Sequence, residues 1–155
     1  MLHALLLAVG LSLALPLDGP WRFHVGADLR WADPSFNCGA WHTRSLAAPA
    51  DANDGDQGIT HFTTGWAAQG CGYQGFASYR IRANDSYLAQ SATAVAGAAM
   101  ADSACQIYVD GRLLGGIEIF NGTKPQAYAI HPAMFAIPQA LRRSLLVAVR
   151  VWMGP

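Results

Sequence analysis

The chain has 155 residues, a formal net charge of zero and only 13% charged side chains. This length suits one domain with a proper hydrophobic core and is too short for two comfortable ones. Because there is no excess of positive charge, the sequence has no basic field that would hold nucleic acid or an anionic membrane surface.

The first segment, residues 1–16, is a nearly unbroken apolar run that ends at Pro16. About 15 apolar residues are too few for a bilayer, which needs about 20, but they suit the core of a secretory signal. We therefore expect a signal peptide or N-terminal hydrophobic leader over 1–16 and an extracytoplasmic location, periplasmic or secreted. A buried N-terminal helix is the alternative.

Short alternating segments typical of β-strands follow, at residues 21–25, 41–46 and 76–83. Between the first two, Asp33-Pro34-Ser35-Phe36 has the pattern of a capped helical turn with proline at its first position. Residues 47–72 are rich in Asp, Asn and Gly and predict a long irregular loop. Such loops inside compact domains are often functional.

The clearest strand signal is a hairpin. Residues 104–109 and 112–115 flank Asp110-Gly111, a pair that tolerates the positive φ required at both central positions of a type I′ turn. Further strands are expected at residues 91–100, 117–120, 128–130 and 145–152, and one helical turn at residues 132–135.

Alternation within these strands predicts which side chains are buried. The expected core includes Ile107, Val109, Leu145, Val147 and Val149. Eight or nine short strands and no long amphipathic helix predict an all-β fold, an antiparallel jelly-roll β-sandwich over residues 17–155.

Several segments resemble a known family: 17–24, 31–36 with Trp41, Gly72-Tyr73-Gln74-Gly75 continuing to Arg80, the hairpin at 107–111, and 147–152. Together they resemble galactose-binding-like jelly rolls, including the sugar-binding N-terminal domain of family 2 glycoside hydrolases. The likeness is greatest to N-terminal extracytoplasmic domains of bacterial membrane signalling proteins. The sequence departs from the family pattern at Asn37-Cys38-Gly39, where the usual acidic pair is lost.

This resemblance implies a noncatalytic ligand-binding or sensory domain at the N-terminus of a membrane signalling protein, with a small molecule or carbohydrate as ligand. The alternative is an accessory sugar-binding domain of a secreted glycoside hydrolase. A third class is a purely structural interaction module. The chain stops directly after a hydrophobic strand, so we expect a piece of a longer protein with downstream membrane or catalytic domains.

A sugar site needs aromatic rings for the apolar face of a pyranose and polar groups for its hydroxyls. Trp66 and Tyr73, with His61 in the same loop region, form the best such set, and Arg80 adds a donor. Trp21, Trp41 and Trp152 are expected to pack in the core instead. For any single loop aromatic, packing is the favoured alternative role.

Catalysis has little support in the sequence. Glu118 is the only glutamate, and no spacing indicates the carboxylate pair that a glycosidase requires. The acidic run at 51–56 fails the calcium-loop pattern, and the histidines form no recognisable metal set. We therefore expect no enzyme activity, no cofactor and no metal.

Three cysteines cannot all pair within one chain. Cys105 occupies an inward strand position and is expected to behave as a small core hydrophobe. Cys38 and Cys71 lie in glycine-rich loops, where either a disulfide or two free thiols would fit.

Overall fold

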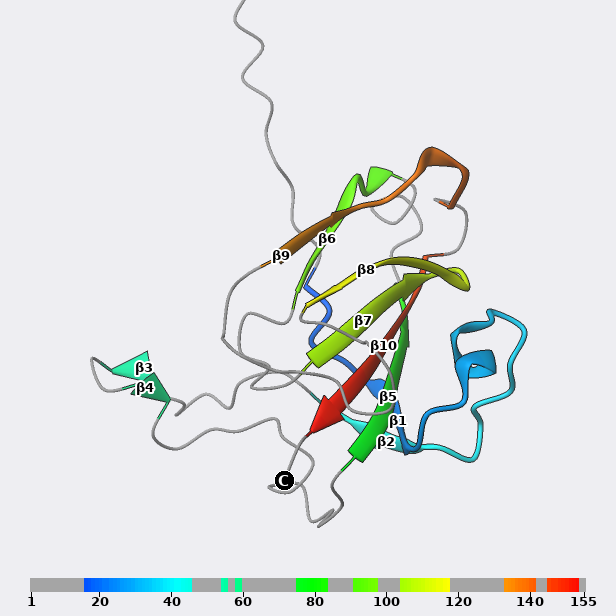
Figure 1. Ribbon diagram of the computed structural model, residues 1–155, viewed down its shortest axis with the longest axis vertical. Helices are drawn as coiled ribbons and strands as arrows, with labels where there is room; N and C mark the ends of the chain where they lie inside the picture. Colours follow the sequence, from blue (N-terminus) through cyan, green and yellow to red (C-terminus); the bar gives the residue numbers. More distant parts are fainter. Residues whose placement is uncertain are drawn as a thin grey trace, which may run out of the picture.

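The computed structural model describes residues 16–45, 54–55, 58–59, 75–83, 91–97, 104–117, 133–141 and 145–153. Its elements are short β-strands and two short 3-10 helices, η1 (Leu29–Ala32) and η2 (Gln139–Leu141), and all strand pairs are antiparallel (Figure 1). The predicted all-β antiparallel fold is confirmed.

Six strands form the main sheet. Their order is β2 (His42–Arg44), β1 (Trp21–Val25), β5 (Gly75–Arg82), β10 (Leu146–Met153), β7 (Ala104–Val109) and β8 (Arg112–Ile117). The longest two, β5 and β10, lie in the middle and pair along their whole length. The sequence prediction located all six strands, with bounds that differ by a few residues.

One face of this sheet forms the hydrophobic core, as expected from side chains that alternate along each strand. Val147 stands opposite Ile81 on one side and Val109 on the other. A second layer, β6 (Ala94–Gly97) paired with β9 (Ala133–Ala136), covers this face and adds Val95 to the core. The sandwich therefore closes around one apolar cluster.

The predicted core residues occupy this cluster. Ile107, Val109, Leu145 and Val147 are between 0% and 3% exposed, and Cys105 is fully buried. Val149 is partly buried and packs against the same cluster. The alternation read from the sequence therefore identifies the core face correctly.

The opposite face of the main sheet, called the second face below, carries polar and cationic side chains. Register places Arg22 opposite Arg80, and Arg80 opposite Ala148. The segment 28–41, which contains η1, lies over part of this face: η1 packs on β10, and Figure 1 shows the segment beside the sheet in blue to cyan. The second face therefore holds buried side chains, such as Arg80, as well as exposed ones, such as Arg82.

The Asp110-Gly111 hairpin turn is confirmed, with φ of 45° and 83° at the two residues. Asp110 does more than turn the chain. Its carboxylate accepts a hydrogen bond from the Leu146 backbone N–H at 2.9 Å, and its own N–H donates to the Leu146 carbonyl at 2.9 Å. The turn therefore also anchors the start of β10.

Two local predictions near this hairpin are wrong. β8 runs unbroken through Gly115-Gly116 to Ile117, where a break was expected. A side chain at either glycine would clash with a neighbour. A Cβ on Gly115 would lie 2.7 Å from the Phe135 ring, and one on Gly116 would lie 2.5 Å from the Cys105 carbonyl oxygen. Phe135 itself is in strand β9, not in the expected helical turn, because pairing with β6 overrides local propensity.

The remaining differences concern loops. The helical turn precedes the Asp33-Phe36 motif, which is a tight turn with the Phe36 N–H donating to the Asp33 carbonyl at 3.1 Å. Within 47–72, two-residue strands β3 (Asp54–Gly55) and β4 (Gly58–Ile59) pair with each other. Cys38 is a free thiol, so the candidate disulfide is not formed.

Several predictions lie outside the described residues: most of the leader, residues 118–120 and the extended segment at 128–130. None of the helices in the described part of the chain is long and apolar enough to cross a membrane.

Candidate functional site

Only one of the four predicted ligand-binding residues, Arg80, lies in the described part of the chain. His61, Trp66 and Tyr73 fall outside the described residues, so their role stays a prediction. Arg80 is in the central strand β5 and is 2% exposed. Its position on the second face makes that face the place to look for a site.

Four rings pack over the sheet next to Arg80, and we call them the aromatic cover: His24, Trp31, Phe36 and Trp41. The Trp31 and Trp41 ring centroids are 5.0 Å apart, and Phe36 lies 5.8 Å from Trp41. His24 lies 5.0 Å from Trp31. Trp41 is buried, as the sequence predicted, and the cover forms a small second core on this face.

Arg80 joins the cover to the sheet. Its two terminal guanidinium nitrogens donate to the backbone carbonyls of Asp33 at 2.8 Å and Phe36 at 3.2 Å. The cation also lies 5.5 Å from the Phe36 ring centroid, a distance suited to a cation–π contact. Burial lowers the pKa of Arg80, since desolvation disfavours the charged form.

A groove with a volume of about 280 Å³ opens beside this arginine. We call it the arginine groove. Its lining includes Arg22, Arg80, Arg82, Phe36, Cys38 and Leu146. The volume approaches the lower end, about 300 Å³, of typical small-molecule sites. The groove therefore has room for a compact polar ligand.

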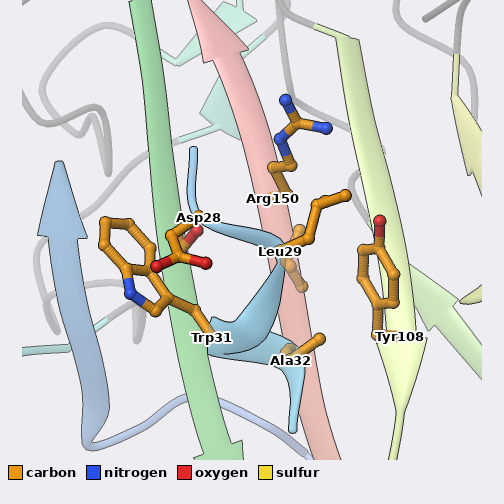
Figure 2. Close-up of a pocket in the computed structure, with 9 residues that line it drawn as sticks. Asp28, Leu29, Trp31, Ala32, Tyr108 and Arg150 are labelled. Carbon is orange, nitrogen blue, oxygen red and sulfur yellow. The ribbon is translucent and has the colours of Figure 1, made fainter. Parts of the chain in front are cut away.

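A second, much smaller hollow lies between η1 and strands β10 and β7. Figure 2 shows Asp28, Leu29 and Trp31 on its η1 side, with Arg150 and Tyr108 rising from the two strands. Its volume of about 10 Å³ is enough for roughly one water molecule. It cannot admit a sugar ring.

Polar side chains beside this hollow are tied to one another. The Gln106 side-chain oxygen accepts hydrogen bonds from the Tyr108 hydroxyl and from Arg150, each at 3.1 Å. The Arg150 cation lies 4.1 Å from the Phe76 ring centroid, and Trp152 packs against Phe76 at 4.8 Å. This arrangement fixes the surface of the sheet around the hollow.

Two carboxylates beside the aromatic cover, Asp28 and Asp33, serve local structure. Hydrogen bonds from Arg30 hold the pKa of Asp28 below its usual range, and bonds from Ser35 do the same for Asp33. A general acid requires the opposite shift. Within the described ranges, no three His, Cys, Asp or Glu side chains gather as a metal site would need.

Sequence analysis missed Arg22, Arg82 and Cys38 as lining residues of one groove. Part of the signal was present, because Arg80 and Arg82 stand two apart and so share a face of their strand. The contribution of Arg22 depends on strand register, and that of Cys38 on how the 33–41 segment folds over the sheet. Neither can be read from local pattern.

Comparison with solved structures gives extensive matches to parts of large enzymes. The chain is similar to a β-glucuronidase from Bacteroides uniformis, with a TM-score of 0.58 and 16% identity over 90% of this chain. It is also similar to a β-glucuronidase from Bifidobacterium dentium, with a TM-score of 0.52 and 22% identity over 88% of this chain. A glycosyl hydrolase family 2 member from Bacteroides cellulosilyticus matches with a TM-score of 0.52 and 18% identity over 90% of this chain.

These matches span only 14%, 19% and 17% of the respective enzyme chains. At such low identities the likeness shows a shared fold, the same β-sandwich that the sequence resemblance implies. No protein-family model matches the sequence, and no curated protein matches it.

Proposed function

We propose that this chain is a noncatalytic accessory domain of a longer carbohydrate-active enzyme and that it contributes to sugar binding. One observation carries the proposal: about nine tenths of this chain matches a small part, between 14% and 19%, of β-glucuronidase chains. A sandwich that occupies so small a part of an enzyme fits a role in positioning substrate or supporting another domain.

The described carboxylates support the noncatalytic part of the proposal. Asp28 and Asp33 have pKa values below the usual range, which suits structural anions and not a proton donor. The sequence has one glutamate, Glu118, so the carboxylate pair that most glycosidases use would need an aspartate, and no spacing in the sequence indicates such a pair.

The membrane signalling interpretation receives no support from the structural neighbours, which are glycoside hydrolases. The accessory-domain alternative is therefore the stronger of the two. We also propose an extracytoplasmic location, which rests on the apolar run at residues 1–16.

For sugar contact we propose the loop side of residues 61–80, with Trp66 and Tyr73 as stacking surfaces, His61 beside them and Arg80 as a donor. The proposal rests on residue chemistry, since a pyranose stacks its apolar face on a ring. The terminal nitrogens of Arg80 already donate to two backbone carbonyls, which leaves the rings as the stronger candidates.

The experiment is to sequence the coding region beyond codon 155. We expect a continuous reading frame that encodes a catalytic barrel with two catalytic glutamates. A frame that continues into transmembrane helices and a signalling output domain would favour the sensory interpretation and overturn this one.

A further inference from the structure

Three arginines converge on the arginine groove through strand geometry alone. Arg22 of β1 stands directly opposite Arg80 of β5 in the antiparallel register. Arg82 lies two residues beyond Arg80 and so shares its face. Like charges on neighbouring strand positions repel one another. The fold therefore concentrates positive charge at one place on a chain whose formal net charge is zero.

Negative charge does not balance this cluster within the groove. No Asp or Glu is among the described residues that line it. Asp33 lies near Arg80, but its carboxylate oxygen already accepts hydrogen bonds from the Ser35 N–H and hydroxyl, both at 2.7 Å. An incoming anion would therefore meet three arginines and no carboxylate in the described lining, while the charge of Asp33 acts on Arg80 from outside that lining.

Arg80 itself has hydrogen-bonding capacity left. It is 2% exposed, and its buried Nε has no hydrogen-bond partner among the described residues. Arg82 is exposed, and no hydrogen bond or ion pair in the described part of the chain occupies its guanidinium. The groove thus combines a buried cation with an accessible one.

We propose that the arginine groove binds a small carboxylate-bearing molecule of the size of a sugar acid. A guanidinium presents a planar fork that matches the two oxygens of a carboxylate, and Arg82 is the accessible fork. Phe36 supplies an apolar wall against which the rest of the molecule packs. The carboxylate part of this inference stands on the groove alone, whereas the sugar part rests on the proposed function.

The test is calorimetric titration of the purified 155-residue chain with three probes: D-glucuronate, its neutral methyl ester and inorganic phosphate. We expect D-glucuronate to bind, the methyl ester to bind at least about tenfold more weakly because it lacks the charge, and higher salt to weaken binding. Equal binding of acid and ester, or no binding of the acid, would overturn the proposal. Phosphate binding as tight as that of the acid would also overturn it, by indicating an unselective anion site.

Two variants locate the site. Arg82→Gln removes the exposed fork and should weaken D-glucuronate binding at least about tenfold. Arg112→Gln, an exposed arginine at the hairpin of β7 and β8, is the matched control and should bind as wild type does. Equal affinity in both variants would place the carboxylate elsewhere.

Cys38 gives a second measurement that needs no variant. It lines the groove and is a free thiol, so a bound acid should slow its alkylation by iodoacetamide, followed by peptide mass mapping. An unchanged rate at saturating D-glucuronate would contradict the proposed position. These outcomes are independent of what lies beyond codon 155. The groove proposal can therefore fail while the accessory-domain proposal stands, and the accessory-domain proposal can fail while the groove proposal stands.

Discussion

Arg80 holds the aromatic cover on the sheet through two hydrogen bonds that come from one planar guanidinium. The fork of its guanidinium reaches the carbonyls of Asp33 and Phe36 together, whereas a lysine ammonium is a point donor. The same side chain forms part of the wall of the arginine groove. One residue therefore serves both folding and the candidate site.

The Arg80→Lys variant should lower the free energy of unfolding by about 1 to 3 kcal/mol, because one of two part-buried hydrogen bonds from the guanidinium is lost. Urea unfolding followed by tryptophan fluorescence measures this change. Arg82→Lys is the matched control, since Arg82 lies exposed in the same strand and should unfold near the wild-type midpoint. Equal midpoints for both variants would show that the Arg80 hydrogen bonds contribute little.

The ring residues of the long loop give a second prediction at this scale. Trp66→Ala and Tyr73→Ala should each weaken binding of a confirmed sugar ligand by about 1 to 3 kcal/mol, as loss of an aromatic anchor commonly does. Calorimetric titration measures the affinity, and thermal unfolding serves as the control. Unchanged affinity in both variants would move the site elsewhere, and loss of folding in both would make these rings core residues.

At the scale of elements, the glycines of β8 allow the two layers of the sandwich to pack closely. Phe135 of β9 packs on β8 at Gly115, where a Cβ would lie 2.7 Å from the ring. The contact joins the β6–β9 layer to the main sheet. Sequence pattern suggests a break at such a glycine pair, yet the strand is continuous because the glycines supply space and not a turn.

The Gly115→Ala variant should lower stability by about 1 to 3 kcal/mol through overpacking against Phe135. The same change made in a Phe135→Leu background should cost less, since the smaller side chain leaves room for the methyl group. Urea unfolding of the wild type, both single variants and the double variant completes a double-mutant cycle. A cycle without coupling would contradict the described contact between β8 and β9.

The central strand β10 allows a test of which of its valines is most deeply buried in the core. Val147 is 1% exposed and lies between β5 and β7, so Val147→Ala should lower the free energy of unfolding by about 1 to 3 kcal/mol through lost burial and a residual cavity. The partly buried Val151 of the same strand is the control, and Val151→Ala should cost less. Both valines face the core cluster, so a larger loss at Val151 would contradict the deeper burial of Val147.

Much of the fold could be predicted from the sequence because its signals are local. Alternation in β7 and β10 and the Asp110-Gly111 turn each depend on neighbouring residues, and all three predictions are confirmed. The strand at Phe135 could not be found this way, because it depends on pairing with β6, about 40 residues earlier in the sequence.

The candidate site depends even more on the whole molecule. The arginine groove requires the register of β1 with β5 and the position of the 33–41 segment above both. Its arginines are scattered in the sequence, so no motif marks them. Across the molecule, one face of the sheet packs in the core, and the second face carries the aromatic cover and the arginine groove.

The central claim is that this sandwich binds a carbohydrate without hydrolysing it. The most direct test is an NMR titration of the purified 155-residue chain with 4-nitrophenyl β-D-glucuronide, followed over time. We predict that protein resonances shift while the anomeric proton signal of the intact glycoside persists. Loss of that signal with release of nitrophenol, abolished by Glu118→Gln, would contradict the noncatalytic claim, and a titration without any protein shifts would contradict binding of this ligand.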